Sequence, residues 1–380
     1  MIFNTTPPAY SSANDSIVYT VYDAHSTDPT HYPDYKYVAE LWISGVLALT
    51  CRRYQQPNTN MGVFDFGPEI REYINSAIAP LSSGVHAKEM GSGVFSVDVV
   101  VKIREEYNGT IGAVVLTDSS RIYFNHYNGR ISGFTILGNY LSKPLSDRPL
   151  TIDIGRNNTY HFIPYFSNVT TPFNVVIVCG STSRTKTIIP SAINTAQLLN
   201  ICPAAINAEW AGTIPTTATY FTVTFGGVTY TCNIIADPLN KNYPVHFLNK
   251  YGSFETHNFS KVSQTQLNIN RKSWQQLAYT VDGSGIVAIK SGNVMNIQAG
   301  NYAVTFEEQI KLNTDMLTDQ DFEWLYQLIV SPLIYIEDSG ILYPVTIDEQ
   351  NYNFKNHDID GLSNLTVSFK FGLSYKTQFN

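Results

Sequence analysis

The sequence predicts a mainly β protein in which tandem β-sandwich-like domains, carrying a few short helices, precede a C-terminal α+β region. The first observation is the alternation of apolar and polar residues, clearest over Val94–Arg104, which is typical of strands with one buried face. The second is turn chemistry between such runs, as at Asn108-Gly109. The third is length, because 380 residues are more than one hydrophobic core usually organises.

Turn-rich and proline-rich stretches divide the chain into four predicted parts. These are an extended arm at 1–15, a β-sandwich domain at 16–147, a second β-sandwich domain at 148–237 and a C-terminal α+β assembly domain at 238–380. The arm is predicted because its residues are rich in proline, serine and asparagine. Pro144 and Pro149 mark the first boundary, and Asp237-Pro238 marks the second.

The first sandwich domain is expected to consist mainly of hairpins. The predicted pairs are Tyr35–Ile43 with Val46–Tyr54, Val94–Arg104 with Ile111–Leu116, and Arg121–Phe124 with Ile131–Leu137. A short helix is predicted within Phe66–Ile78, because Pro68 lies near its start and apolar residues follow at helical spacing.

Strands continue through the second domain, with one helical insert predicted at Ile193–Asn200. The expected strands are Tyr160–Phe166, Val175–Cys179, Tyr220–Phe225 and Val228–Ile234. In the C-terminal region, Thr318 and Asp321 form a capping-box pattern before an apolar stripe, which predicts a helix that ends before Pro332. A hairpin and a last strand at Leu365–Phe371 follow.

Composition restricts the possible partners. Charged residues make up only 14% of the chain, against an ordinary share of about 25%. The chain also has 25 tyrosines, a residue that suits both strand faces and protein interfaces. The net charge is −7 and the basic residues are scattered, so no nucleic-acid partner is expected. No membrane span and no signal peptide are expected either, which predicts synthesis in a cytoplasm.

A search for catalytic or ligand-binding motifs leads to no predicted catalytic, cofactor or metal residue. His25 and His31 share a loop, but ordinary loop polarity is the favoured interpretation over a metal. Ser183-x-x-Lys186 lacks the partner motifs of penicillin-binding enzymes. Gly283-Ser-Gly285 is followed by strand-like residues rather than a helix, so a hairpin turn is favoured over a nucleotide site. Adjacent carboxylates such as Glu105-Glu106 should point to opposite faces of a strand.

Several segments in the N-terminal and C-terminal parts of the chain are similar to segments of structural proteins from tailed bacteriophages, especially those infecting Bacteroidota. They are Tyr37–Ile43, Gly62–Phe66, Tyr243–Phe259, Leu267–Arg271, Asn313–Leu325, Leu328–Ile336 and Leu342–Ile347. The resemblance implies a component of the virion tail, tail tip or baseplate. It carries no catalytic residue over to this chain. The low charge and the absence of a signal peptide agree with it.

The leading functional hypothesis is a non-enzymatic virion protein that forms a homo-oligomeric ring or adaptor and contacts other virion proteins. The interface candidates are the arm and the residues Trp324, Tyr326, Tyr335 and Tyr343. The alternative is a glycan- or receptor-binding β-sandwich module, in which exposed aromatic rings stack on sugars. A third class, a glycosidase, would need two carboxylates facing one cleft.

Overall fold

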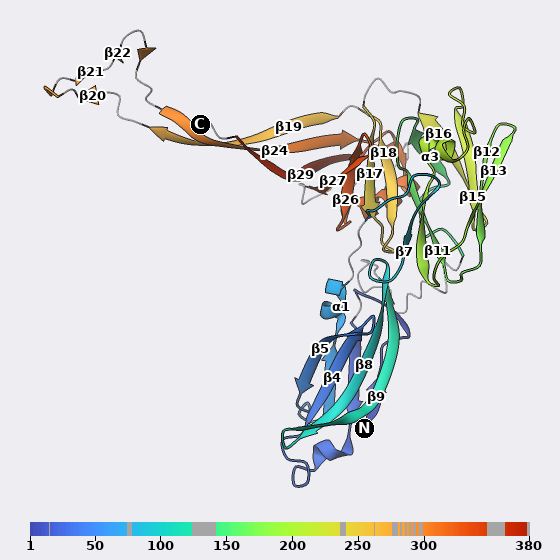
Figure 1. Ribbon diagram of the computed structural model, residues 1–380, viewed down its shortest axis with the longest axis vertical. Coiled ribbons are helices and arrows are strands. Elements are labelled where there is room, and N and C mark those ends of the chain that lie inside the picture. The colour runs from blue at the N-terminus through green and yellow to red at the C-terminus, as the bar shows by residue number, and fades with distance from the viewer. Residues whose placement is uncertain are drawn as a thin grey trace.

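The computed structural model confirms a mainly β protein built from several sheets that are consistent with tandem β-sandwich-like domains (Figure 1). It describes residues 1–14, 16–73, 78–123, 142–235, 241–261, 263–275, 280–281, 283–285, 287–288, 290–291, 294–295, 299–347 and 362–377. An N-terminal sandwich lies at one end of the molecule, a middle sandwich lies beside a C-terminal sheet at the other, and a long β-ribbon projects from that sheet (Figure 1).

The N-terminal sandwich packs a three-stranded sheet on a five-stranded one. The first sheet contains β1 (Ile2–Thr5), β3 (Val18–Tyr22) and β6 (Met61–Asp65), and the second contains β2 (Tyr10–Ser12), β9 (Thr110–Tyr123), β8 (Ser96–Tyr107), β4 (Lys36–Ile43) and β5 (Val46–Arg53). Their alternating apolar residues, such as Val97, Val99 and Val101 on β8, meet in one buried core. The predicted hairpins turned at Ser44-Gly45 and Asn108-Gly109 are confirmed.

The first residues do not form a separate arm, so that prediction is wrong. Strand β1 pairs with β3 in antiparallel fashion, and β2 pairs with β9 in parallel fashion. The ring of Phe3 packs 5.9 Å from that of Tyr19, measured between centroids. Pairing satisfies backbone groups and buries apolar area that a free arm would leave in water. The short elements η1 (Ala24–Thr27) and α1 (Gly67–Tyr73) complete this module.

The middle sandwich combines a five-stranded sheet with a three-stranded sheet. The five-stranded sheet runs β10 (Thr151–Gly155), β16 (Val228–Ile235), β15 (Tyr220–Phe225), β12 (Phe173–Cys179) and β13 (Thr182–Ile188); the three-stranded sheet runs β11 (Phe162–Ser167), β14 (Thr195–Asn200) and β7 (His86–Met90). The predicted strands of this domain are confirmed. The four cysteines of the chain are free thiols.

The three-stranded sheet β11–β14–β7 is a central layer, and its strands β11 and β14 are buried on both faces. Ile163 and Tyr165 face the core of the middle sandwich. Phe162 and Phe166 alternate with them and face a second core, the junction core, which also contains Leu248 of the C-terminal sheet. The sheet therefore joins the two modules by burying apolar side chains on each side.

Two predictions, one domain boundary and one helix, are wrong because of this layer. Strand β7 lies in sequence within the predicted first domain, yet it pairs with β14, so the boundary at 147/148 does not separate the two modules. The predicted helix at Ile193–Asn200 is strand β14, because its residues face a core on each side and lose the alternation that identifies a strand. The helix of this region is α3 (Pro203–Glu209), where proline at the first position favours helix initiation.

The C-terminal module is a seven-stranded sheet with one helix on it. In order, its strands are β18 (Phe254–Phe259), β17 (Tyr243–Leu248), β26 (Ile334–Asp338), β27 (Ile341–Ile347), β29 (Thr366–Thr377), β24 (Ala299–Asn313) and β19 (Gln264–Gln275). The helix α4 (Asp319–Ile329) has the predicted capping box between Thr318 and Asp321. The predicted hairpin after it and the last strand are also confirmed.

Short pairs of strands complete the described part of the chain. They are β20 (Thr280–Val281) with β21 (Val287–Ala288), β22 (Lys290–Ser291) with β23 (Val294–Met295), and β25 (Leu317–Thr318) with β28 (Leu362–Ser363). The β20–β21 pairing confirms the hairpin predicted around Gly283-Ser-Gly285. The predicted hairpin ending at Ile131–Leu137 lies outside the described residues.

The central layer yields a stability prediction. We expect Phe166→Ala to lower the free energy of unfolding by about 3–5 kcal/mol, because Phe166 is fully buried in the junction core and alanine would leave a cavity. Urea unfolding followed by circular dichroism measures the change. The control is Val46→Ala, at a side chain 65% exposed, which should change stability by less than about 0.5 kcal/mol. Equal effects of the two substitutions would contradict the assigned layer.

Candidate functional site

The most distinctive surface is the β-ribbon that projects from the C-terminal sheet (Figure 1). We define the β-arm as 264–275 of β19 with 299–309 of β24 and 370–377 of β29. Strand β19 pairs with β24 along its whole length, and β24 pairs in turn with β29. Strand β19 is the last strand of the sheet order, so one row of its backbone N–H and C=O groups faces outward.

The β-arm leaves apolar side chains in solvent. All positions from 264 to 273 on β19 are exposed. Among them, Leu267 is 53% and Ile269 is 45% exposed. Their spacing places both side chains on one face of the strand. Exposed leucine or isoleucine is ordinary when single, but two neighbours on one face of an edge strand form an apolar patch.

The exposed face of the β-arm continues a face that is buried in the body. Ile310 and Leu312 on β24 belong to the core between the sheet and α4. Ile310 pairs with Thr265 on β19, and the register then brings Glu308 opposite Leu267 and Phe306 opposite Ile269. Because alternate residues share a face, Leu267 and Ile269 lie on the face that α4 covers near Ile310. The sheet thus extends beyond the core that the helix completes.

A shallow groove also crosses the β-arm, with a volume of about 410 Å³. Its lining residues are Asn268, Ile269, Asn270, Thr305 and Glu307. The one carboxylate in this lining, on Glu307, forms an ion pair with Lys370 at 2.6 Å. The groove is therefore a neutral amide-lined surface, and the pair of carboxylates that glycoside hydrolysis requires is absent from its lining.

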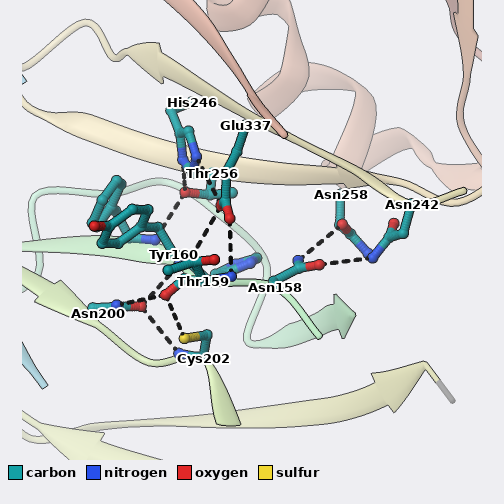
Figure 2. A network of polar contacts seen from close by, with 12 residues as sticks. Asn158, Thr159, Tyr160, Asn200, Cys202, Asn242, His246, Thr256, Asn258 and Glu337 are labelled. Atoms are coloured by element: carbon teal, nitrogen blue, oxygen red, sulfur yellow. Dashed lines mark hydrogen bonds and ion pairs between the residues drawn. The ribbon is translucent and has the colours of Figure 1, made fainter. Parts of the chain in front are cut away.

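The direction of the β-arm depends on polar contacts between the middle sandwich and the C-terminal sheet (Figure 2). The buried carboxylate of Glu337 on β26 accepts hydrogen bonds from the backbone N–H groups of Thr159 (3.0 Å) and Tyr160 (3.1 Å). The hydroxyl of Thr256 on β18 accepts the N–H of Phe162 at 2.8 Å. A third contact joins the amides of Asn158 and Asn258 at 3.1 Å. These directional bonds set the orientation of the two modules.

Within this network, Thr256, His246 and Glu337 follow one another as a hydroxyl, an imidazole and a carboxylate. The Thr256 hydroxyl lies 2.7 Å from His246 Nδ1, and His246 Nε2 lies 3.5 Å from the carboxylate of Glu337. The order resembles that of a hydrolase triad. However, the three side chains are buried between two sheets, where no substrate can reach the hydroxyl. We therefore assign the arrangement a structural role.

Burial keeps the histidines of the junction neutral. It lowers the pKa of His246 and lowers that of His257 to about 3, the latter helped by the charge of Arg148. The same two causes hold the pKa of His161 well below its usual value. In Glu337, burial would raise the pKa, but contacts with His246 and Thr159 outweigh it and lower the pKa. His246 is fully buried, and the ring of His257 meets that of Phe259 edge-on at 4.9 Å between centroids, so both histidines have packing roles.

Trp324, predicted as an interface residue, is instead buried within its own chain. It is 3% exposed, and its indole N–H donates to the carboxylate of Glu255. The guanidinium of Arg148 lies 4.8 Å from the centre of its ring. Asn249 donates a second hydrogen bond to Glu255, at 2.6 Å. Because the indole has its partners inside the chain, Trp324 anchors α4 to the sheet and is not available to a neighbouring subunit.

The three tyrosines predicted as interface residues are not brought together. Tyr326 lies on α4 and is 42% exposed. Tyr335 on β26 is half-buried and meets Phe254 edge-on at 6.0 Å between ring centroids, on the side of the junction core. Tyr343 on β27 is half-buried beside Phe371. Side-chain spacing alone could not separate these environments, because each depends on which element covers the sheet.

The motifs weighed for catalysis lie in ordinary structural settings. Ser183 and Lys186 are on the edge strand β13, where the Lys186 ammonium pairs with Glu209. As predicted, Glu105 and Glu106 point to different partners, His25 and Arg52 respectively. No helix in the described ranges is both long and apolar enough to cross a membrane.

Comparison with known proteins gives little guidance. No family model matches the chain, and no curated protein matches it. A solved structure described as an insight into host cell surface retention of a 1.5-MDa bacterial ice-binding adhesin is 10% identical. It aligns over 83% of this chain and 92% of that chain with a TM-score of 0.15. A likeness at that level carries no argument about fold or function.

The junction histidines predict a pH dependence. An unfolded histidine binds a proton near pH 6.5, whereas folded His257 does so only at about pH 3. Between these values the unfolded chain holds the extra proton, so stability falls as pH falls, by about 1.4 kcal/mol per pH unit. We expect His257→Gln to reduce the loss between pH 6.5 and 5 by about 2 kcal/mol in urea unfolding.

The control for the pH experiment is Thr256→Val, which breaks the same buried network without removing a titratable group. It should lower stability by similar amounts at pH 6.5 and pH 5. Glu255 acts in the opposite sense, because burial raises its pKa and the resulting stability is lost as pH rises. The histidine assignment would be wrong if His257→Gln and the wild-type chain lost equal stability on acidification.

A separate prediction concerns the position of Trp324. We expect Trp324→Phe to cost about 1–3 kcal/mol of unfolding free energy, because it leaves the buried carboxylate of Glu255 without one donor. The control is Val330→Ala at the end of α4, a side chain 42% exposed, where a change below about 0.5 kcal/mol is expected. If Trp324→Phe leaves thermal unfolding unchanged and alters only the oligomeric state, the residue belongs to an interface.

Proposed function

We propose that this protein is a structural subunit of a large assembly, a virion protein of the tailed-phage type that forms a homo-oligomeric ring or adaptor through its β-arm. The observation that carries the proposal is the β-arm itself, a sheet whose outer strand is exposed along 264–273. The low share of charged residues and the similarity of several segments to phage tail proteins support the virion context.

The physical argument begins with what a β-sheet needs. Sheets are stable when at least one face packs on another layer, and an exposed edge strand is a template for pairing with another chain. The β-arm has an open edge on β19 and an apolar patch at Leu267 and Ile269. Soluble monomers usually protect such edges with bulges, prolines or short strands. Strand β19 has 12 residues and contains no proline, and its register irregularity lies at Lys272/Ser273, beyond the apolar patch, so a neighbour is the natural cover of the patch.

The neighbour is proposed to be a second copy of this chain. The β-arm projects away from the rest of the same chain (Figure 1), so the apolar patch at Leu267 and Ile269 cannot pack on a core of that chain. A contact between the arm of one copy and the body of the next is heterologous, and repeated around an axis it closes a ring. The polar junction supports this role, because it holds the arm at a defined angle to the middle sandwich.

Assembly is tested with a double substitution in the β-arm, Leu267→Lys with Ile269→Lys. Native mass spectrometry and mass photometry at micromolar concentration should show a closed oligomer for the wild-type chain. The double variant should remain monomeric, because two buried ammonium groups would oppose the contact. Its unfolding should be unchanged, since both side chains are solvent-exposed in the single chain.

The matched control is Ile189→Lys, at a side chain 66% exposed in the middle sandwich, which should assemble like the wild-type chain. A wild-type chain that stays monomeric at high concentration, alone and with purified particles, would overturn the proposal. Assembly of the double variant with wild-type stoichiometry would show that the β-arm is not the contact. Electron cryo-microscopy of the oligomer then shows what covers β19.

A further inference from the structure

A cluster of three potential metal ligands lies at one end of the N-terminal sandwich. The ligand atoms of Asp23, His25 and Glu105 all lie within 4.8 Å of one another. His25 Nδ1 is 3.1 Å from Glu105 Oε2 and 3.5 Å from Asp23 Oδ1. Donor atoms about 2.0–2.2 Å from a shared metal ion lie about 3–3.5 Å apart, so the two separations that involve the His25 imidazole suit one ion.

Two separate parts of the chain position the cluster. Asp23 follows β3 and caps η1 by accepting the N–H of His25 at 2.9 Å, which places the imidazole beside the carboxylate. Glu105 arrives from β8, where it pairs with Tyr37 of β4 and shares the inner face of the sheet. The ring of Tyr32 stacks on His25 with centroids 4.0 Å apart and limits its rotation. The His25 side chain is 42% exposed, so an ion could enter from solvent.

A second observation comes from Tyr35, which is outside the ligand set. Tyr35 is 7% exposed, and its hydroxyl is buried without a hydrogen-bond partner. Burial chiefly, and then nearby charges that include those of Asp23 and Glu105, raise its pKa. Buried hydroxyls normally have a partner. A water molecule held by a cation at the cluster would supply one.

Charges around the cluster leave room for a cation. The Met1 ammonium lies 3.0 Å from Asp23 Oδ2, which leaves Oδ1 on the side of His25. Two carboxylates against one ammonium give a net negative charge when the imidazole is neutral. A neutral imidazole with carboxylate oxygens is a ligand set that favours zinc-like ions, whereas calcium and magnesium prefer oxygen ligands alone.

We propose that Asp23, His25 and Glu105 bind a divalent transition-metal ion of the zinc class and thereby tie the loop after β3 to strand β8. The ion would be held by one nitrogen and two oxygen atoms of the chain, and water would complete its coordination. The sequence alone favoured ordinary loop polarity around His25. Glu105 lies 80 residues further along the chain, so no ligand spacing in the sequence reveals the cluster.

The test is isothermal titration calorimetry. Bound metal is first removed from the full chain with a chelator, and zinc chloride is then added. Wild type should bind one ion per chain and melt at a higher temperature with zinc, whereas calcium and magnesium should give at least tenfold weaker binding. His25→Ala should weaken zinc binding at least tenfold. His31→Ala is the matched control, because His31 lies in the same loop and pairs with Asp28. It should bind zinc like the wild-type chain.

Glu105→Gln provides a second variant of nearly equal size, and it should also weaken zinc binding at least tenfold. It keeps the experiment decisive if His25→Ala fails to fold. The proposal is overturned if the wild-type chain shows no saturable zinc binding. It is equally overturned if the variants at positions 25 and 105 bind zinc like the wild-type chain, or if only His31→Ala loses binding. None of these outcomes depends on the β-arm or on oligomer formation.

Discussion

The arrangement of the whole molecule depends on the central sheet β11–β14–β7 being buried on both faces. A sheet with one buried face belongs to one sandwich, whereas this one contributes Ile163 and Tyr165 to one core and Phe162 and Phe166 to another. Since neither core can form without it, the middle sandwich and the C-terminal sheet are expected to fold as one unit. The position of the C-terminal sheet relative to the middle sandwich therefore depends on this layer.

Apolar burial alone would not define how the modules are turned relative to each other, because the hydrophobic effect has no direction. The polar network supplies that direction. Glu337 accepts two backbone N–H groups from the middle sandwich, and Thr256 accepts a third. A small rotation would leave these buried groups without partners at a cost of about 1–3 kcal/mol each. Buried histidines remain neutral there, so the network adds no unpaired positive charge from imidazole.

Local patterns in the sequence predicted most strands, because the alternation of apolar residues and the turn residues depend only on neighbouring positions within one hairpin. The capping box of α4 was predictable for the same reason, since Thr318 and Asp321 act on adjacent backbone groups. Prediction failed where two distant layers meet. Strand β14 faces two cores and lost its alternation, and β7 joined a sheet beyond its predicted domain. Asp23 and Glu105 meet only through the register of the folded sheet, and the burial of Trp324 depends on Glu255.

The two ends of the seven-stranded sheet have opposite character, and this contrast bears on assembly. At the β17–β18 end, polar and apolar contacts with the middle sandwich cover the sheet on one side, and α4 covers it on the other. At the β19 end, no described residue covers the strand. Hydrogen bonding is continuous between these ends, so a load applied to the β-arm acts across a row of strands anchored at the junction. The proposed role of holding a neighbour at a defined angle would use both the anchored end and the open end.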